Sequence, residues 1–174
     1  MLRVQIVPCT LPNAEADALN QESGRVYTNT PVWRDRIYRR TGHWLSANAA
    51  GRLEDALGGP TLLHAHSRAA AQHGFSAACT VARAQRRRGL GSHYPHRHKS
   101  YRTTNWKQTG MRLHDRAGAR AGEREDGMVG VLLLARARGL EPVRAALSPP
   151  LQGLPAEAYK QVELIWERAA RTYE

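Results

Sequence analysis

The spacing of hydrophobic residues changes along the chain, and these changes mark the elements that we expect. Leu2, Val4 and Ile6 alternate with polar residues before Pro8, which predicts a half-buried strand. Downstream of this strand, apolar residues recur at spacings of three to five, as on one face of a helix. We therefore expect helices over residues 13–22, from Pro31 to residue 41, over 46–57 and over 64–88.

Beyond Gly91 the apolar spacing becomes typical of strands. We expect strands over residues 101–106, 111–113, 129–135, 143–147 and 161–166. A turn near Gly110 should join the first two, and the third and fourth should form a hairpin. Residues 116–127 contain three glycines without periodicity, which predicts a flexible loop.

This order of elements predicts an α+β fold, with a helical bundle inserted into a small antiparallel β-barrel or sheet. The first strand of the barrel would be residues 1–10, and the inserted helical region would be residues 11–91. The remaining strands would fall within residues 92–174. The longest apolar run is far shorter than the roughly 20 residues of a membrane span. Cys9 and Cys79 belong to no paired-cysteine motif, so we expect a cytoplasmic protein that does not contact a membrane.

Charge is distributed unevenly. Residues 56–114 contain no Asp or Glu but hold ten of the 26 Lys and Arg and seven of the eight His, in a chain whose formal net charge is +11. Carboxylates would weaken the field of a surface that binds phosphates, so this window predicts a polyanionic partner. We interpret it as a surface for RNA, DNA or both.

The densest part of this window is residues 93–107, where cations alternate with aromatic residues. Cations bind the phosphate backbone, and flat rings stack on accessible bases. The predicted backbone contacts are Arg86, Arg87, Arg88, Arg97, Lys99, Arg102 and Lys107, and the predicted stacking residues are Tyr101 and Trp106. Two alternatives remain open: the arginines at 86–88 compensate the negative end of a helix dipole, and the two aromatic residues pack in the core.

Residues suited to catalysis or metal binding form no convincing pattern. The carboxylates fall at helix starts, in the loop and in the last strand, so they do not predict a two-metal nuclease site. His93, His96 and His98 have no carboxylate or thiolate ligand beside them, and their cationic surroundings disfavour a divalent ion. We expect no cofactor and no catalytic activity of the chain alone, and keep a histidine-based metalloenzyme as a contrasting hypothesis.

Three stretches carry a resemblance to a known family: residues 67–75 (SRAAAQHGF), 94–107 (YPHRHKSYRTTNWK) and 110–113 (GMRL). With the opening strand and the helices before them, they resemble the N-terminal half of TnpB-like proteins of bacterial transposable elements, which are similar to miniature type V CRISPR effectors. Residues 94–113 are the specific part of this resemblance.

The resemblance implies a wedge-like β-barrel with an inserted helical recognition region, which together hold a guide RNA and its target DNA. In the family a RuvC-like domain with three acidic ligands cuts DNA, and neither this triad nor a four-cysteine zinc ribbon occurs in these 174 residues. The chain would then be a truncated or split transposase-associated product, or a domesticated binding module, with a separately encoded RuvC-like domain as a further partner. The alternative is a stand-alone RNA- or DNA-binding protein with a regulatory or structural role.

Overall fold

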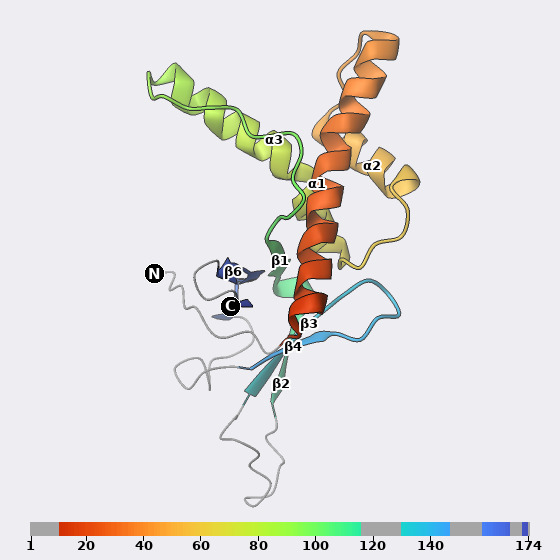
Figure 1. Ribbon diagram of the computed structural model, residues 1–174, viewed down its shortest axis with the longest axis vertical. Coiled ribbons are helices and arrows are strands. Elements are labelled where there is room, and N and C mark those ends of the chain that lie inside the picture. The colour runs from red at the N-terminus through yellow and green to blue at the C-terminus, as the bar shows by residue number, and fades with distance from the viewer. Residues whose placement is uncertain (1–10, 116–129, 147–157, 168–171, 174) are drawn as a thin grey trace, which may run out of the picture.

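A computed structural model describes residues 11–115, 130–146, 158–167 and 172–173 (Figure 1). The predicted strand within residues 1–10 and the predicted loop over 116–127 lie outside the described residues. The described part of the chain begins with three helices and continues with short antiparallel strands. The α+β class is therefore confirmed, and in this part the helices precede the strands.

The first helix, α1 (Asn13–Thr41), is a single helix of 29 residues where two were expected. Pro31 lies inside it and is itself buried. Proline lacks the N–H that would bond to the carbonyl of Tyr27, so it normally ends or kinks a helix. Here the Thr30 hydroxyl donates to the carbonyl of Val26 (3.2 Å). Pro31 is the last buried residue of α1, and residues 32–35 after it are partly buried. Packing of these residues outweighs the local preference to stop, which sequence spacing alone does not reveal.

The other two helices match the prediction closely. Helix α2 (Ala47–Leu57) starts after Ser46, whose hydroxyl accepts the N–H of Ala49, and it ends at Gly58. Helix α3 (Ala65–Arg87) starts after His64 and ends at Arg88. Figure 1 shows the first part of α3 crossing the middle of α1, and the two helices diverging toward the end of α3.

A buried carboxylate joins α2 to α3. Glu54 has no exposed surface, and its Oε2 accepts from Nε and Nη2 of Arg68 at 3.0 and 2.8 Å. The amide of Gln72 also donates to this oxygen at 3.1 Å. Burying a charge is costly unless it is paired, so this cluster fixes how the two helices pack.

The described strands form three separate antiparallel sheets. Strand β1 (Thr104–Lys107) pairs with β5 (Gln161–Leu164). Strands β2 (Met111–Asp115), β3 (Gly130–Leu134) and β4 (Val143–Ala146) form the second sheet, in the order β2-β3-β4. Strands β6 (Trp166–Glu167) and β7 (Thr172–Tyr173) form the third. The β3–β4 hairpin is confirmed, whereas the strand expected over 161–166 is split between β5 and β6.

The turn expected near Gly110 is confirmed as the 3-10 turn η1 (Gln108–Gly110), which joins β1 to β2, and each of these strands pairs with another strand. Of the expected barrel or sheet, the structure has open sheets, which do not close into a barrel within the described residues. A closed barrel needs a continuous ladder of strands, and here the ladder is interrupted between β1–β5 and β2–β4. The division of the chain at residues 10 and 91 stays a prediction.

The hydrophobic core spans both parts of the fold. It combines residues of α1, such as Leu19 and Val26, with Ala71 of α3 and with strand residues including Trp106 and Leu132. The helices are therefore held against the sheets by shared apolar burial. In the described residues, no helix combines the length and the apolar character needed to cross a membrane.

Candidate nucleic-acid interface

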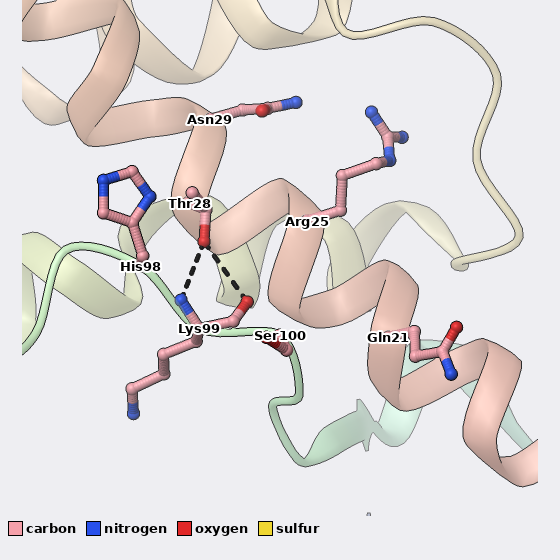
Figure 2. Close-up of a pocket in the computed structure, with 7 residues that line it drawn as sticks. All are labelled: Gln21, Arg25, Thr28, Asn29, His98, Lys99 and Ser100. Carbon is pink, nitrogen blue, oxygen red and sulfur yellow. Dashed lines mark hydrogen bonds between the residues drawn. The ribbon is translucent and has the colours of Figure 1, made fainter.

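Residues 93–103, called here the basic segment, run back from α3 along α1 to β1 (Figure 1). Side chains of α1 hold its backbone. The Tyr27 hydroxyl donates to the carbonyl of His96 (3.1 Å). The Thr28 hydroxyl accepts the N–H of Lys99 (3.0 Å) and can donate to the Lys99 carbonyl (3.3 Å), as Figure 2 shows. Because its backbone is bonded to the helix, the segment has a defined position without regular secondary structure.

Close contact between the segment and α1 depends on Gly24. A Cβ atom at this position would lie 2.7 Å from the carbonyl oxygens of both Lys99 and Ser100. Real Cβ atoms do not approach backbone that closely, so any larger residue would push the segment away. Gly24 thus allows the backbone of the basic segment to lie directly against the helix.

Arg102 is partly buried and makes its contacts within the fold. Its guanidinium lies 6.0 Å from the ring centroid of Tyr27 and donates to the Thr103 carbonyl (3.2 Å) and the Ser23 hydroxyl (3.4 Å). A Cβ at Gly74 would lie 3.1 Å from its Nη2. Burial lowers the pKa of the Arg102 guanidinium, which is partly opposed by Tyr27 and Glu163. Arg102 thus fastens the end of the segment between α1 and α3, and its phosphate contact stays a prediction.

The two predicted stacking residues have different surroundings. Trp106 is only 1% exposed, and its Nε1–H donates to the carbonyl of Ala135 at 2.7 Å. It is a core residue in this fold and cannot stack on a base. Tyr101 is 49% exposed, and its hydroxyl accepts a hydrogen bond from Nε2 of Gln21 (2.8 Å). Its ring remains accessible.

The other predicted cations are exposed. None of them forms an ion pair with a described residue; they are Arg86, Arg87, Arg88, Arg97, Lys99 and Lys107. Arg86 lies 5.5 Å from the ring centroid of Tyr94, and Lys99 lies 5.1 Å from that of Tyr27. Cation–π contacts of this kind orient a cation without neutralising it. Lys107 ends β1 opposite Gln161, so it belongs to the sheet and not to the basic segment.

Three elements bring arginines together around Cys79 of α3. Burial raises the pKa of the Cys79 thiol, and Arg34 of α1, Arg83 of α3 and Arg97 of the basic segment partly oppose this effect. Each of these guanidinium groups therefore lies near the Cys79 thiol. The prediction from sequence missed Arg34 and Arg83. Arg34 lies outside the acid-free window, and Arg83 carries no aromatic neighbour in sequence that would have marked it.

An open pocket of about 280 Å³ lies where the basic segment meets α1 (Figure 2). Its lining is polar, with side chains of two cations and several hydrogen-bonding groups. The residues that line it are Gln21, Arg25, Thr28, Asn29, His98, Lys99 and Ser100. Arg25 is paired with Glu22 (2.7 Å), whereas Lys99 pairs with no described acid. The pocket is too open to enclose a small molecule, but it suits a charged group on a larger ligand.

No described residues form a cluster of three or more His, Cys, Asp or Glu that could hold a metal ion. The described part of the basic surface therefore consists of cations, aromatic rings and hydrogen-bonding groups. No protein-family model matches this chain, and no curated protein matches it either. Function must therefore be inferred from the surface itself.

Proposed function

We propose that this protein binds nucleic acid through a surface built from the basic segment, the C-terminal half of α3 and the facing side of α1. One observation carries the proposal. Exposed cations of the end of α3 and of the basic segment lie on this surface and pair with no described acid: Arg86, Arg87, Arg88, Arg97 and Lys99. Exposed guanidinium and ammonium groups held in one place favour a polyanion, since binding releases the counterions of its phosphates.

The hydrogen bonds and close contact that hold the basic segment on α1 support this proposal. A solvated basic loop would not need Tyr27, Thr28 and Gly24 to hold its backbone against α1. Prior fixation reduces the entropy that the segment would lose when it binds a ligand. The arrangement is therefore suited to contact a phosphate backbone with little rearrangement.

The salt dependence of binding tests this proposal. Affinity for a structured RNA hairpin and for a DNA duplex is measured between low and moderate salt for the wild type and for the R97Q/K99Q double variant. The plot of log K against log salt should lose about one unit of slope for each phosphate contact removed. R52Q/R138Q is the matched control, because both arginines are exposed and make no ion pair with a described residue. In Figure 1, α2 and the β3–β4 loop, which carry them, lie on the other side of α1 from the basic segment.

Equal slopes for wild type and R97Q/K99Q would contradict the proposed surface, as would an equal loss of slope in the control. The R87Q/R88Q variant addresses the end of α3. Cations near a helix C-terminus stabilise it by roughly 0.3–1 kcal/mol each. If the two arginines serve only the helix dipole, their loss should lower the melting temperature and leave the salt slope unchanged.

The finer proposal concerns the source of the nucleic acid. By its resemblance over residues 94–113 to TnpB-like proteins, this chain would hold a guide RNA and target DNA and would depend on a RuvC-like domain for cleavage. Sequencing the DNA downstream of the codon for Glu174 tests this idea: a RuvC-like coding segment in or near the reading frame supports it, and an unrelated gene contradicts it.

A second candidate is a stand-alone RNA- or DNA-binding protein of regulatory or structural role. The open sheets favour it, because the family resemblance implies a barrel and the described strands do not close into one. Both candidates use the same basic surface, so the salt titration tests what they share and the downstream sequence separates them.

A further inference from the structure

An exposed pair of stacked aromatic rings lies at the C-terminal end of α1. The rings of Tyr38 and Trp44 have centroids 4.2 Å apart and planes inclined by only 14°. Tyr38 is 39% exposed and Trp44 is 57% exposed. Large aromatic side chains usually bury most of their surface, and here over half of an indole remains accessible to a ligand.

The local backbone explains why the two rings meet. α1 ends at Thr41, and Gly42 adopts a left-handed conformation with φ of 72°. Its N–H donates to the carbonyl of Tyr38 at 2.8 Å, which closes the last turn. A left-handed residue reverses the chain after a helix, so Trp44 returns over the last turn and reaches Tyr38. The pair is therefore formed before any ligand arrives.

One arginine lies beside the pair: the guanidinium carbon of Arg34 is 5.9 Å from the ring centroid of Trp44. Three more follow on the same two turns of α1: Arg36, whose guanidinium carbon lies 4.9 Å from the ring centroid of Trp33, Arg39, which is paired with Asp35 at 2.9 Å, and Arg40. Cations near the end of a helix also compensate its dipole, but that effect does not require an exposed, stacked tyrosine and tryptophan.

We propose that the Tyr38–Trp44 pair is a stacking site for an unpaired base of single-stranded nucleic acid, with the neighbouring arginines contacting its phosphates. This inference rests on the proposed nucleic-acid function and deepens it by naming the form of the ligand. Every base has a flat face that stacks on an aromatic ring, whereas the bases of an intact duplex stack on each other and are not available. The cationic surroundings favour a nucleic-acid strand over an uncharged apolar partner. Arg34 connects this site to the basic surface, since it also donates to Ser76 of α3 (2.9 Å) and lies near Cys79.

The test compares a labelled 12-nucleotide oligo(dT) with a 12-base-pair DNA duplex, using fluorescence anisotropy over a range of salt concentrations. Stacking involves no counterion release, so the Y38L/W44L variant should bind oligo(dT) about 5- to 150-fold more weakly with an unchanged salt slope. Its affinity for the duplex should stay within about twofold of the wild type. W44F retains a ring and should recover most of the binding to oligo(dT), and circular dichroism checks that each variant is folded.

The possible results distinguish this inference from the proposed function. If the wild type binds neither these probes nor the RNA hairpin, both are overturned. If R97Q/K99Q shows the expected loss of slope but Y38L/W44L binds oligo(dT) like the wild type, only the stacking site is overturned. An equal loss of affinity for both probes, or a failure of W44F to recover binding, also contradicts it. So does a concentration-dependent dimer, seen by sedimentation, that Y38L/W44L abolishes, because the rings would then be covered by a second copy.

Discussion

The contact between Gly24 and the basic segment makes a sharp prediction about the G24A variant. The new methyl group would lie 2.7 Å from the carbonyl oxygens of Lys99 and Ser100 and 2.8 Å from the Ser100 carbonyl carbon. All three atoms are backbone, so the clash cannot be relieved by rotating a side chain. We expect the segment to move away from α1, which disrupts the two hydrogen bonds between Thr28 and Lys99.

The size of the effect follows from these bonds. A hydrogen bond contributes about 0.5–1.5 kcal/mol to stability, so losing two lowers the local opening free energy by about 1–3 kcal/mol. This makes the detached segment about 5- to 150-fold more populated. Alanine is about 1 kcal/mol better than glycine inside a helix, so global stability should fall less than local stability.

Limited trypsin digestion followed by mass spectrometry measures the local effect at the bonds after Arg97 and Lys99. When opening is fast relative to cleavage, the cleavage rate follows the open population and should rise by the same factor. T28V, which removes the hydroxyl without adding bulk, should reproduce much of the increase. G51A is the matched control in another helix, because its Cβ would meet the side-chain oxygen of Gln72 at 3.1 Å and would not touch the segment. Unchanged cleavage in G24A, or equal acceleration in G51A, would refute the docking of the segment on α1.

Three further predictions concern the core and its pH dependence. Replacing Glu54 with Ala leaves Asp55 (3.0 Å) as the remaining ion-pair partner of Arg68 among the described residues, and it should lower the unfolding free energy by about 3 kcal/mol in urea titrations. A loss below about 1 kcal/mol would contradict the buried cluster. W106F should lower the urea midpoint, because it leaves a cavity in the core and removes the hydrogen-bond donor to the Ala135 carbonyl. It should leave the salt slope of RNA binding unchanged. A changed slope would place Trp106 at the ligand. Burial, followed by the charge of the nearby His66, lowers the pKa of His64. As the pH falls, the unfolded state therefore binds a proton on this residue before the folded state does. Stability should then fall as pH decreases through about 6.5. H64N can still cap α3 and should show a smaller loss of urea midpoint between pH 7.5 and 5.5 than the wild type; equal losses would refute the assignment to His64.

Local signals in the sequence predicted much of the secondary structure. Ser46 and the cluster at 58–60 mark the ends of α2, and the spacing of small apolar residues marks α3 almost to its last residue. The β3–β4 hairpin was also predictable, because its two apolar strands flank a short segment containing Gly139, which has a φ of 87°. These features depend on neighbours in sequence, so the sequence contains the information needed to predict them.

The candidate site was predictable only in part. The acid-free window correctly located exposed cations such as Arg97 and Lys99, because their charge is a property of the residue itself. Whether a side chain is buried depends on what packs on it, so the same pattern could not separate Trp106 in the core from Tyr101 at the surface. For the same reason, Arg102 looked like its neighbours although it is fixed between α1 and α3.

By itself, the sequence determined the regional charge, the helix ends and the types of residue available to contact phosphates and bases. Tertiary structure decided that α1 continues through Pro31, that the strands around Gly110 join different sheets and that the described strands form open sheets. It also placed the basic segment on α1 and stacked Trp44 on Tyr38. Each of these outcomes depends on contacts between residues distant in sequence or on a chain reversal, and the free energy of such packing exceeds the local preferences that a sequence pattern reports.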